Sequence, residues 1–78
     1  MAPLPTPEQI RRADEIDRAR HAALMCAELV GQTEGEIKIV QDEPKHEGKA
    51  RKLAALQGKL AARLLALADA RYRLDSLA

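Results

Sequence analysis

The residue types that most often carry out chemistry are scarce in this chain and poorly spaced for it. His21 and His46 are the only histidines, and Cys26 is the only cysteine. These residues do not form a metal-binding pattern such as His-x-x-x-His or Cys-x-x-Cys. Cys26 follows the apolar run 22–25, so we expect a small buried hydrophobe, and a lone cysteine fits a reducing compartment. The sequence therefore predicts no metal and no cofactor.

Nucleophiles and carboxylates are present without the surroundings that would activate them. Ser76 lies close to the C-terminus, and the neighbouring acids Asp14/Glu15 and Asp42/Glu43 read as solvated faces of a helix or turn. The sequence has no glycine-rich phosphate loop and no nucleophile motif. A short chain that forms only helices also lacks a concave pocket. We therefore expect a protein that is not an enzyme and has no small-molecule substrate.

Basic side chains gather in the second half of the chain. Residues 1–43 carry five basic and nine acidic side chains, whereas residues 44–78 carry eight basic and three acidic ones. Tyr72 is the only aromatic residue, so stacking on nucleic-acid bases has no platform. A nucleic-acid contact remains the alternative, and its candidate residues are Lys45, Lys49, Arg51 and Lys52.

The composition predicts an all-α protein. Fifteen Ala and eleven Leu supply most of the apolar side chains, and both residue types favour helices. Residues 1–6 contain two prolines and are expected to form a flexible leader, which lacks the pattern of a signal peptide. No apolar stretch is long enough to cross a membrane. We therefore expect a cytoplasmic protein with no membrane partner.

Two long helices are expected, over about residues 7–42 and 48–77, with a turn at about 43–47. Thr6, Pro7 and Gln9 form a capping box with proline at the first helical position, and Pro44 ends the helix. The glycines at 31 and 35 suggest a break near Gly31–Gly35. Residues 36–41 also alternate like a strand, but a lone strand has no pairing partner, so helix is preferred.

The apolar pattern of the second helix suggests more than one packing neighbour. A leucine row is accompanied by a second row at roughly heptad spacing. Two adjacent rows are typical of a bundle helix rather than a simple two-stranded coiled coil. The two rows are Leu53, Leu56, Leu60, Leu64, Leu67 and Leu74, and then Ala54, Ala61, Leu65, Ala68 and Tyr72.

Folding the chain about Pro44–Lys45 gives an antiparallel helical hairpin with a definite expected register. Small residues then face one another, which predicts a close approach of the helices. The same register places an acidic stretch across from the basic cluster, which predicts ion pairs between the helices. The expected small pairs are Gly31 with Gly58, Ala27 with Ala62, Ala23 with Ala66, and Ala19 with Ala70; the acids are Glu34, Glu36, Asp42 and Glu43.

A two-helix hairpin leaves an outer apolar face exposed, and a core of this size supplies only about 3–5 kcal/mol. We therefore predict a homodimer that forms a four-helix bundle. The same apolar patch could instead dock another protein, because methionine suits adaptable surfaces. The residues assigned to the dimer or partner interface are Ala23, Met25, Cys26, Leu29, Val30, Leu60, Leu64 and Leu67.

The preferred function is a small protein–protein interaction module, in the class of adaptors, co-chaperones and inhibitors. The alternative is a nucleic-acid-binding regulator of plasmid or phage type. Helical hairpins that dimerise around small core residues include RNA-binding copy-control proteins of plasmids, and this chain is similar to them in architecture only. The abundance of Ala and Arg suggests a bacterial, phage or plasmid source.

Overall fold

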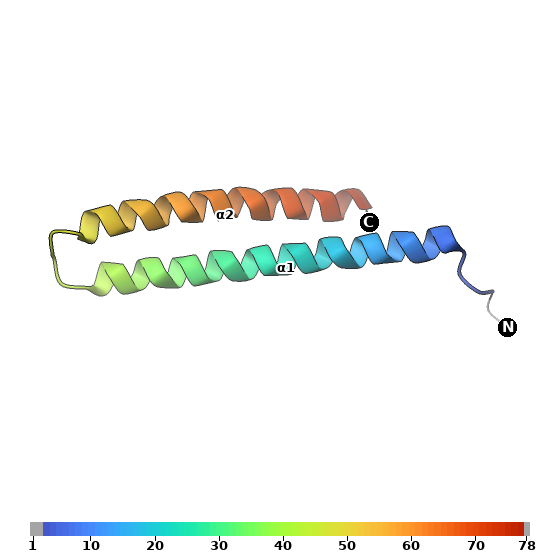
Figure 1. The fold of residues 1–78 in the computed structure, drawn as a ribbon, viewed down its shortest axis with the longest axis horizontal. Helices are drawn as coiled ribbons and strands as arrows, with labels where there is room; N and C mark the ends of the chain where they lie inside the picture. The colour runs from blue at the N-terminus through green and yellow to red at the C-terminus, as the bar shows by residue number, and fades with distance from the viewer. Residues whose placement is uncertain (1–2, 78) are drawn as a thin grey trace.

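The computed structural model describes residues 3–77 and contains two antiparallel helices (Figure 1). Helix α1 spans Pro7–Asp42 and α2 spans Lys49–Leu77. The described residues include no strand, so the predicted all-α hairpin is confirmed and the strand alternative for residues 36–41 is wrong. Residues 3–6 precede α1 outside any helix, and the first two residues of the predicted leader lie outside the described part of the chain.

The N-terminus of α1 is fixed by the predicted capping box. The Thr6 hydroxyl accepts a hydrogen bond from the Gln9 backbone N–H at 3.2 Å, and Gln9 Oε1 accepts one from the Thr6 N–H at 2.9 Å. Pro7 occupies the first helical position, where its missing N–H costs nothing. Two of the backbone donors that a helix start leaves free are thereby satisfied.

Replacing Thr6 by alanine is expected to lower the free energy of unfolding by about 1 kcal/mol, because it removes the hydroxyl that accepts the hydrogen bond from the Gln9 N–H. Thr6→Ser keeps the hydroxyl and should remain within a few tenths of a kcal/mol of the wild type. Denaturant unfolding followed by circular dichroism at one protein concentration measures both. Equal losses in the two variants would contradict the capping role.

The helix α1 is continuous through its glycines, so the break expected near Gly31–Gly35 is wrong. Neighbouring α1 residues supply enough packing to hold these two positions helical: Val30, Thr33 and Ile37 are all buried against α2. Packing of one helix face outweighs a propensity cost of about 1 kcal/mol per glycine.

The core is a single narrow seam between α1 and α2. The residues that turn toward the other helix recur at alternating spacings of three and four, as in a coiled coil. Five apolar side chains are buried there, and they are Val30, Ile37, Val40, Leu67 and Ala70. The second row expected on α2, with Leu65 and Tyr72, lies outside this seam and is exposed. The hairpin thus buries one apolar row of each helix and leaves the second apolar row of α2 exposed to solvent.

The register expected from equal distances to the turn holds only in part: Ala19 and Ala70 line one shallow groove, but the expected contact between Gly31 and Gly58 is absent. Gly31 and Gly58 are both exposed, and no atom outside their own helices lies within 4 Å of where a Cβ would stand. A helix advances by about 100° per residue, so positions equally far from a turn need not face each other. The contact across the seam instead joins Thr33 to Arg63. Nothing in the structure of the hairpin explains Gly58.

The turn places the two helices unequally along the long axis. The N-terminal turns of α1 extend past the C-terminal end of α2 (Figure 1). Ile10 lies on this overhang and is exposed. The whole hairpin measures 68 × 19 × 13 Å, so it is a thin rod with two broad faces.

Candidate functional site

The long rod presents no deep cleft in its described residues, but one broad face carries two shallow grooves. The first has a volume of about 480 Å³ and the second about 410 Å³. Both run between α1 and α2, and we call this side the groove face. The first groove is lined on α1 by Glu15, Arg18, Ala19, Ala22 and Cys26, and on α2 by Ala66, Asp69, Ala70, Arg73 and Leu77. The second is lined by Glu36, Ile39, Val40, Lys52, Ala55 and Leu56.

Exposed apolar side chains lie between the two grooves. Met25 stands seven residues after Arg18, and Leu29 stands seven before Glu36, so both fall on the groove face by heptad spacing. Met25 is 45% exposed and Leu29 is 36% exposed. The middle of this face thus carries the apolar side chains of Met25 and Leu29 on α1 and the cation Lys59 on α2.

The structure divides the residues predicted to form an interface. Ala23, Cys26, Val30, Leu60 and Leu67 turn toward the other helix and are buried or half-buried in the hairpin's own seam. Met25, Leu29 and Leu64 remain exposed. The division arises because residues one position apart on a helix point about 100° apart, so one apolar run cannot serve a single surface.

A polar contact that the sequence reasoning missed lies in the middle of the seam. Thr33 is fully buried, and its hydroxyl donates to the Leu29 carbonyl at 2.8 Å. The Arg63 guanidinium reaches across from α2, donating through Nη1 to the Thr33 hydroxyl and, at 3.2 Å, to the Leu29 carbonyl. The available signal was Arg63 itself, since it falls between Leu60 and Leu67 at the seam spacing.

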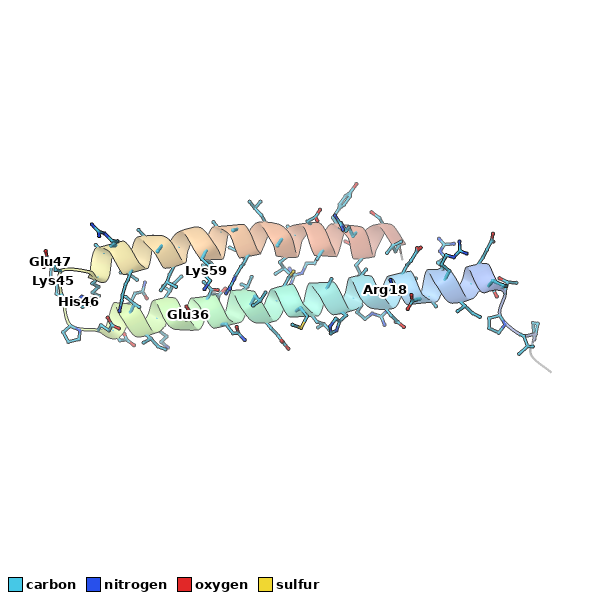
Figure 2. All side chains as sticks on the ribbon, in the orientation of Figure 1. Arg18, Glu36, Lys45, His46, Glu47 and Lys59 are labelled. Atoms are coloured by element: carbon cyan, nitrogen blue, oxygen red, sulfur yellow. The ribbon has the colours of Figure 1, made fainter. Side chains whose placement is uncertain are left out.

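The basic cluster predicted near the turn is divided between surfaces: Lys45, which lies beside His46 in the turn (Figure 2), shares a shallow pocket with Lys49 but not with Arg51 or Lys52. Lys49 Nζ donates to the backbone carbonyls of Gln41 at 2.9 Å and Glu43 at 2.5 Å, so this cation caps the C-terminal end of α1. Lys45 lies in the turn and Lys52 lines the second groove. Arg51 is exposed elsewhere on α2. Lys49 is thereby committed to holding the hairpin together.

The turn itself is closed by an acid–imidazole contact. His46 Nε2 lies 2.9 Å from Glu43 Oε2. The hydrogen bond from His46 lowers the pKa of the Glu43 carboxyl, desolvation opposes this effect, and the positive charges of Lys52, His46 and Lys49 lower the pKa further. Glu43 is extended because the α region is disfavoured before Pro44.

The lowered pKa of Glu43 predicts a small pH dependence of stability. Because the folded-state value lies below the ordinary 4.5, the contribution is complete above that pH and is lost as the pH falls through the lowered value. Glu43→Gln should therefore be less stable than the wild type near neutral pH, with the difference shrinking at about pH 3. Urea unfolding of both proteins at the two pH values measures this. A difference that grows in acid would contradict the assignment.

The predicted ion pairs between the helices are absent from the described residues. The ion pairs there join residues three or four apart: Asp14–Arg18, Asp17–Arg20, Glu43–His46 and Asp69–Arg73. Glu36 and Lys52 line the same groove without forming an ion pair within 4 Å.

Residues 3–77 hold no group of three or more His, Cys, Asp or Glu side chains placed to bind a metal ion. Neither helix combines the length and the apolar content needed to cross a membrane over the described residues. The chain matches no protein-family model, and neither a curated protein nor a solved structure is significantly similar to it.

Proposed function

We propose that the protein is a helical interaction module that works as a homodimeric four-helix bundle and binds a macromolecular partner, most simply another protein. It belongs to the class of adaptors, co-chaperones and inhibitors, and it acts without catalysis in the cytoplasm.

The observation that carries this proposal is the imbalance between the core and the outer surface. Only five apolar side chains are buried in the described residues, whereas large apolar side chains are exposed along much of the rod. Exposed apolar rows on both helices are the pattern of a bundle helix that has a further neighbour. The exposed large side chains within the helices are Ile10, Leu24, Met25, Leu29, Ile39, Leu64, Leu65 and Tyr72.

Sedimentation velocity tests the proposal most directly. At micromolar concentration we expect a single species with the mass of two chains, twice 8.6 kDa. A monomer that stays folded at tens of micromolar would contradict self-association. A monomer that loses its circular dichroism signal on dilution would support it, because folding would then depend on the partner copy.

The nucleic-acid alternative has less support from the geometry. Of the four candidate contacts, Lys49 is engaged with backbone carbonyls, and the others do not share one surface. Binding to RNA or duplex DNA that weakens steeply with salt would favour this alternative, since phosphate contacts release counterions. We expect no such binding at physiological salt.

A further inference from the structure

The broad face opposite the groove face combines alanines and a glycine with charged side chains and two leucines, and we call it the alanine face. The first groove is lined by Ala22 and Ala66, so these two residues mark the groove face. The residues of the opposite face then follow from the heptad spacing of each helix. Its α1 residues are Ala13, Asp17, Arg20, Leu24, Ala27, Gly31, Glu34 and Lys38, and its α2 residues are Ala50, Ala54, Gln57, Ala61, Leu64, Ala68, Arg71 and Asp75.

Two copies of the α1 row of the alanine face are complementary when they lie antiparallel with Ala27 of each copy at the centre. Glu34 then meets Arg20, and Lys38 meets Asp17, so every charge in the central rows finds its opposite. Leu24 meets Gly31 in the same alignment. Leu24 is 61% exposed, and the space around Gly31 is empty, so a projecting side chain meets a recess.

The α2 row fits the same two-fold axis. Cys26 and Ala66 line one groove, so an axis through Ala27 crosses α2 near Ala66. Leu64 of one copy then lies over Ala68 of the other, again large against small. Toward the ends of the α2 row, Gln57 of one copy approaches Asp75 of the other. The charged pairs between the two α1 helices lie beside this contact.

We infer that the occupant of the alanine face is a second copy of this chain, packed with its turn at the opposite end, so that α1 lies on α1 and α2 on α2. This inference rests on the self-association proposed above and names its surface and direction. The part of the face that both helices form is limited by the 29 residues of α2, about 44 Å at 1.5 Å per residue, and is 19 Å wide, so its footprint is close to the roughly 800 Å² per partner of a standard interface.

Charge favours this arrangement over its competitors. With the turns at the same end, α1 would lie on α2 of the other copy, and Arg20 and Arg71 of both chains would converge. An antiparallel pair joined through the groove face would bring Arg18 onto Glu36 but would also oppose Lys59 to Arg73. Like charges in contact oppose association, whereas the antiparallel alanine-face pair brings opposite charges together. The arrangement also gives Gly31 a role, because it leaves room for Leu24 of the other copy. The isolated hairpin gives Gly31 no such role.

Filling the recess at Gly31 tests the surface. Gly31→Leu has open space in the monomer and better helix propensity, so the hairpin should form, while the added side chain should strike Leu24 of the other copy. We expect the dimer dissociation constant to rise by about tenfold or more. Gly35→Leu, at a second glycine with equally open surroundings but off the alanine face, is the matched control and should leave it unchanged.

Charge reversal tests the direction. Glu34→Arg alone should weaken the dimer, because the new cation faces Arg20 of the other copy. Adding Arg20→Glu to the same chain should restore association, because the two reversed residues meet across the axis. A purely structural role within one hairpin predicts no such rescue.

Cross-linking separates failure of this inference from failure of the proposed function. In a Cys26→Ala background, Ala27→Cys should join two chains through a short bis-maleimide linker, whereas Leu29→Cys on the groove face should not. A wild-type protein that is monomeric in sedimentation overturns both proposals. A dimer that cross-links through Leu29→Cys, or that tolerates Gly31→Leu, overturns the alanine-face arrangement alone.

Discussion

Leu67→Ala is expected to lower the free energy of unfolding by about 2–5 kcal/mol, the largest single effect in the chain. Leu67 is 7% exposed and is one of five buried apolar residues among those described. Truncating it removes apolar contact and leaves a void that a two-helix seam cannot close from a second layer. The loss is a large fraction of the stability of so small a core.

Leu65→Ala is the matched control, because it makes the same chemical change two residues away on the same helix. Leu65 is 73% exposed, so its truncation should change stability by no more than about 0.5 kcal/mol. Urea unfolding of both variants is compared at one fixed protein concentration, since dimer formation makes apparent stability depend on concentration. Similar losses for the two variants would show that the seam runs along a different face of α2.

Arg63→Leu is expected to raise the free energy of unfolding by about 1–2 kcal/mol, the second large effect. The guanidinium sits half-buried in the seam and donates to two neutral oxygens, with no carboxylate within 4 Å among the described residues. Leucine would add apolar contact there. No polar atom would be left unsatisfied, because the Thr33 hydroxyl keeps its own bond to the Leu29 carbonyl.

The control for Arg63→Leu is Arg51→Leu, which makes the same substitution at an exposed position of α2. It should change stability by less than about 0.5 kcal/mol. A gain in both variants would point to a general effect of removing positive charge. A loss of 1 kcal/mol or more in Arg63→Leu alone would mean that the polar contact with Thr33 is worth more than the apolar contact that replaces it.

The two broad faces suggest a division of tasks in the proposed assembly. A dimer formed through the alanine face leaves the groove face, with Met25 and Leu29, open on both sides of the bundle. That face is therefore where we expect the macromolecular partner to bind. Met25→Glu should disturb partner binding without dissociating the dimer, whereas Gly31→Leu should do the reverse.

The local features of the fold could be predicted from the sequence because they depend on neighbouring residues. The capping box at Thr6 is satisfied within three residues, and Pro44 ends α1 by acting on Glu43. The abundance of Ala and Leu also determined that the chain would form helices. Continuity through Gly31 and Gly35 was not predictable in this way, because packing against α2 decides it.

The choice of packing face was decided by the tertiary structure. Arg63 and Leu64 both fit the spacing between Leu60 and Leu67, and hydrophobicity alone selects Leu64. The hairpin turns Arg63 inward because that position continues the heptad seam, where the long aliphatic stem packs and the guanidinium finds the Thr33 and Leu29 oxygens. Leu64 is consequently left outside. The sequence by itself thus determined two capped helices and a turn, whereas contact between the helices decided which side chains form the core and which remain free for a partner.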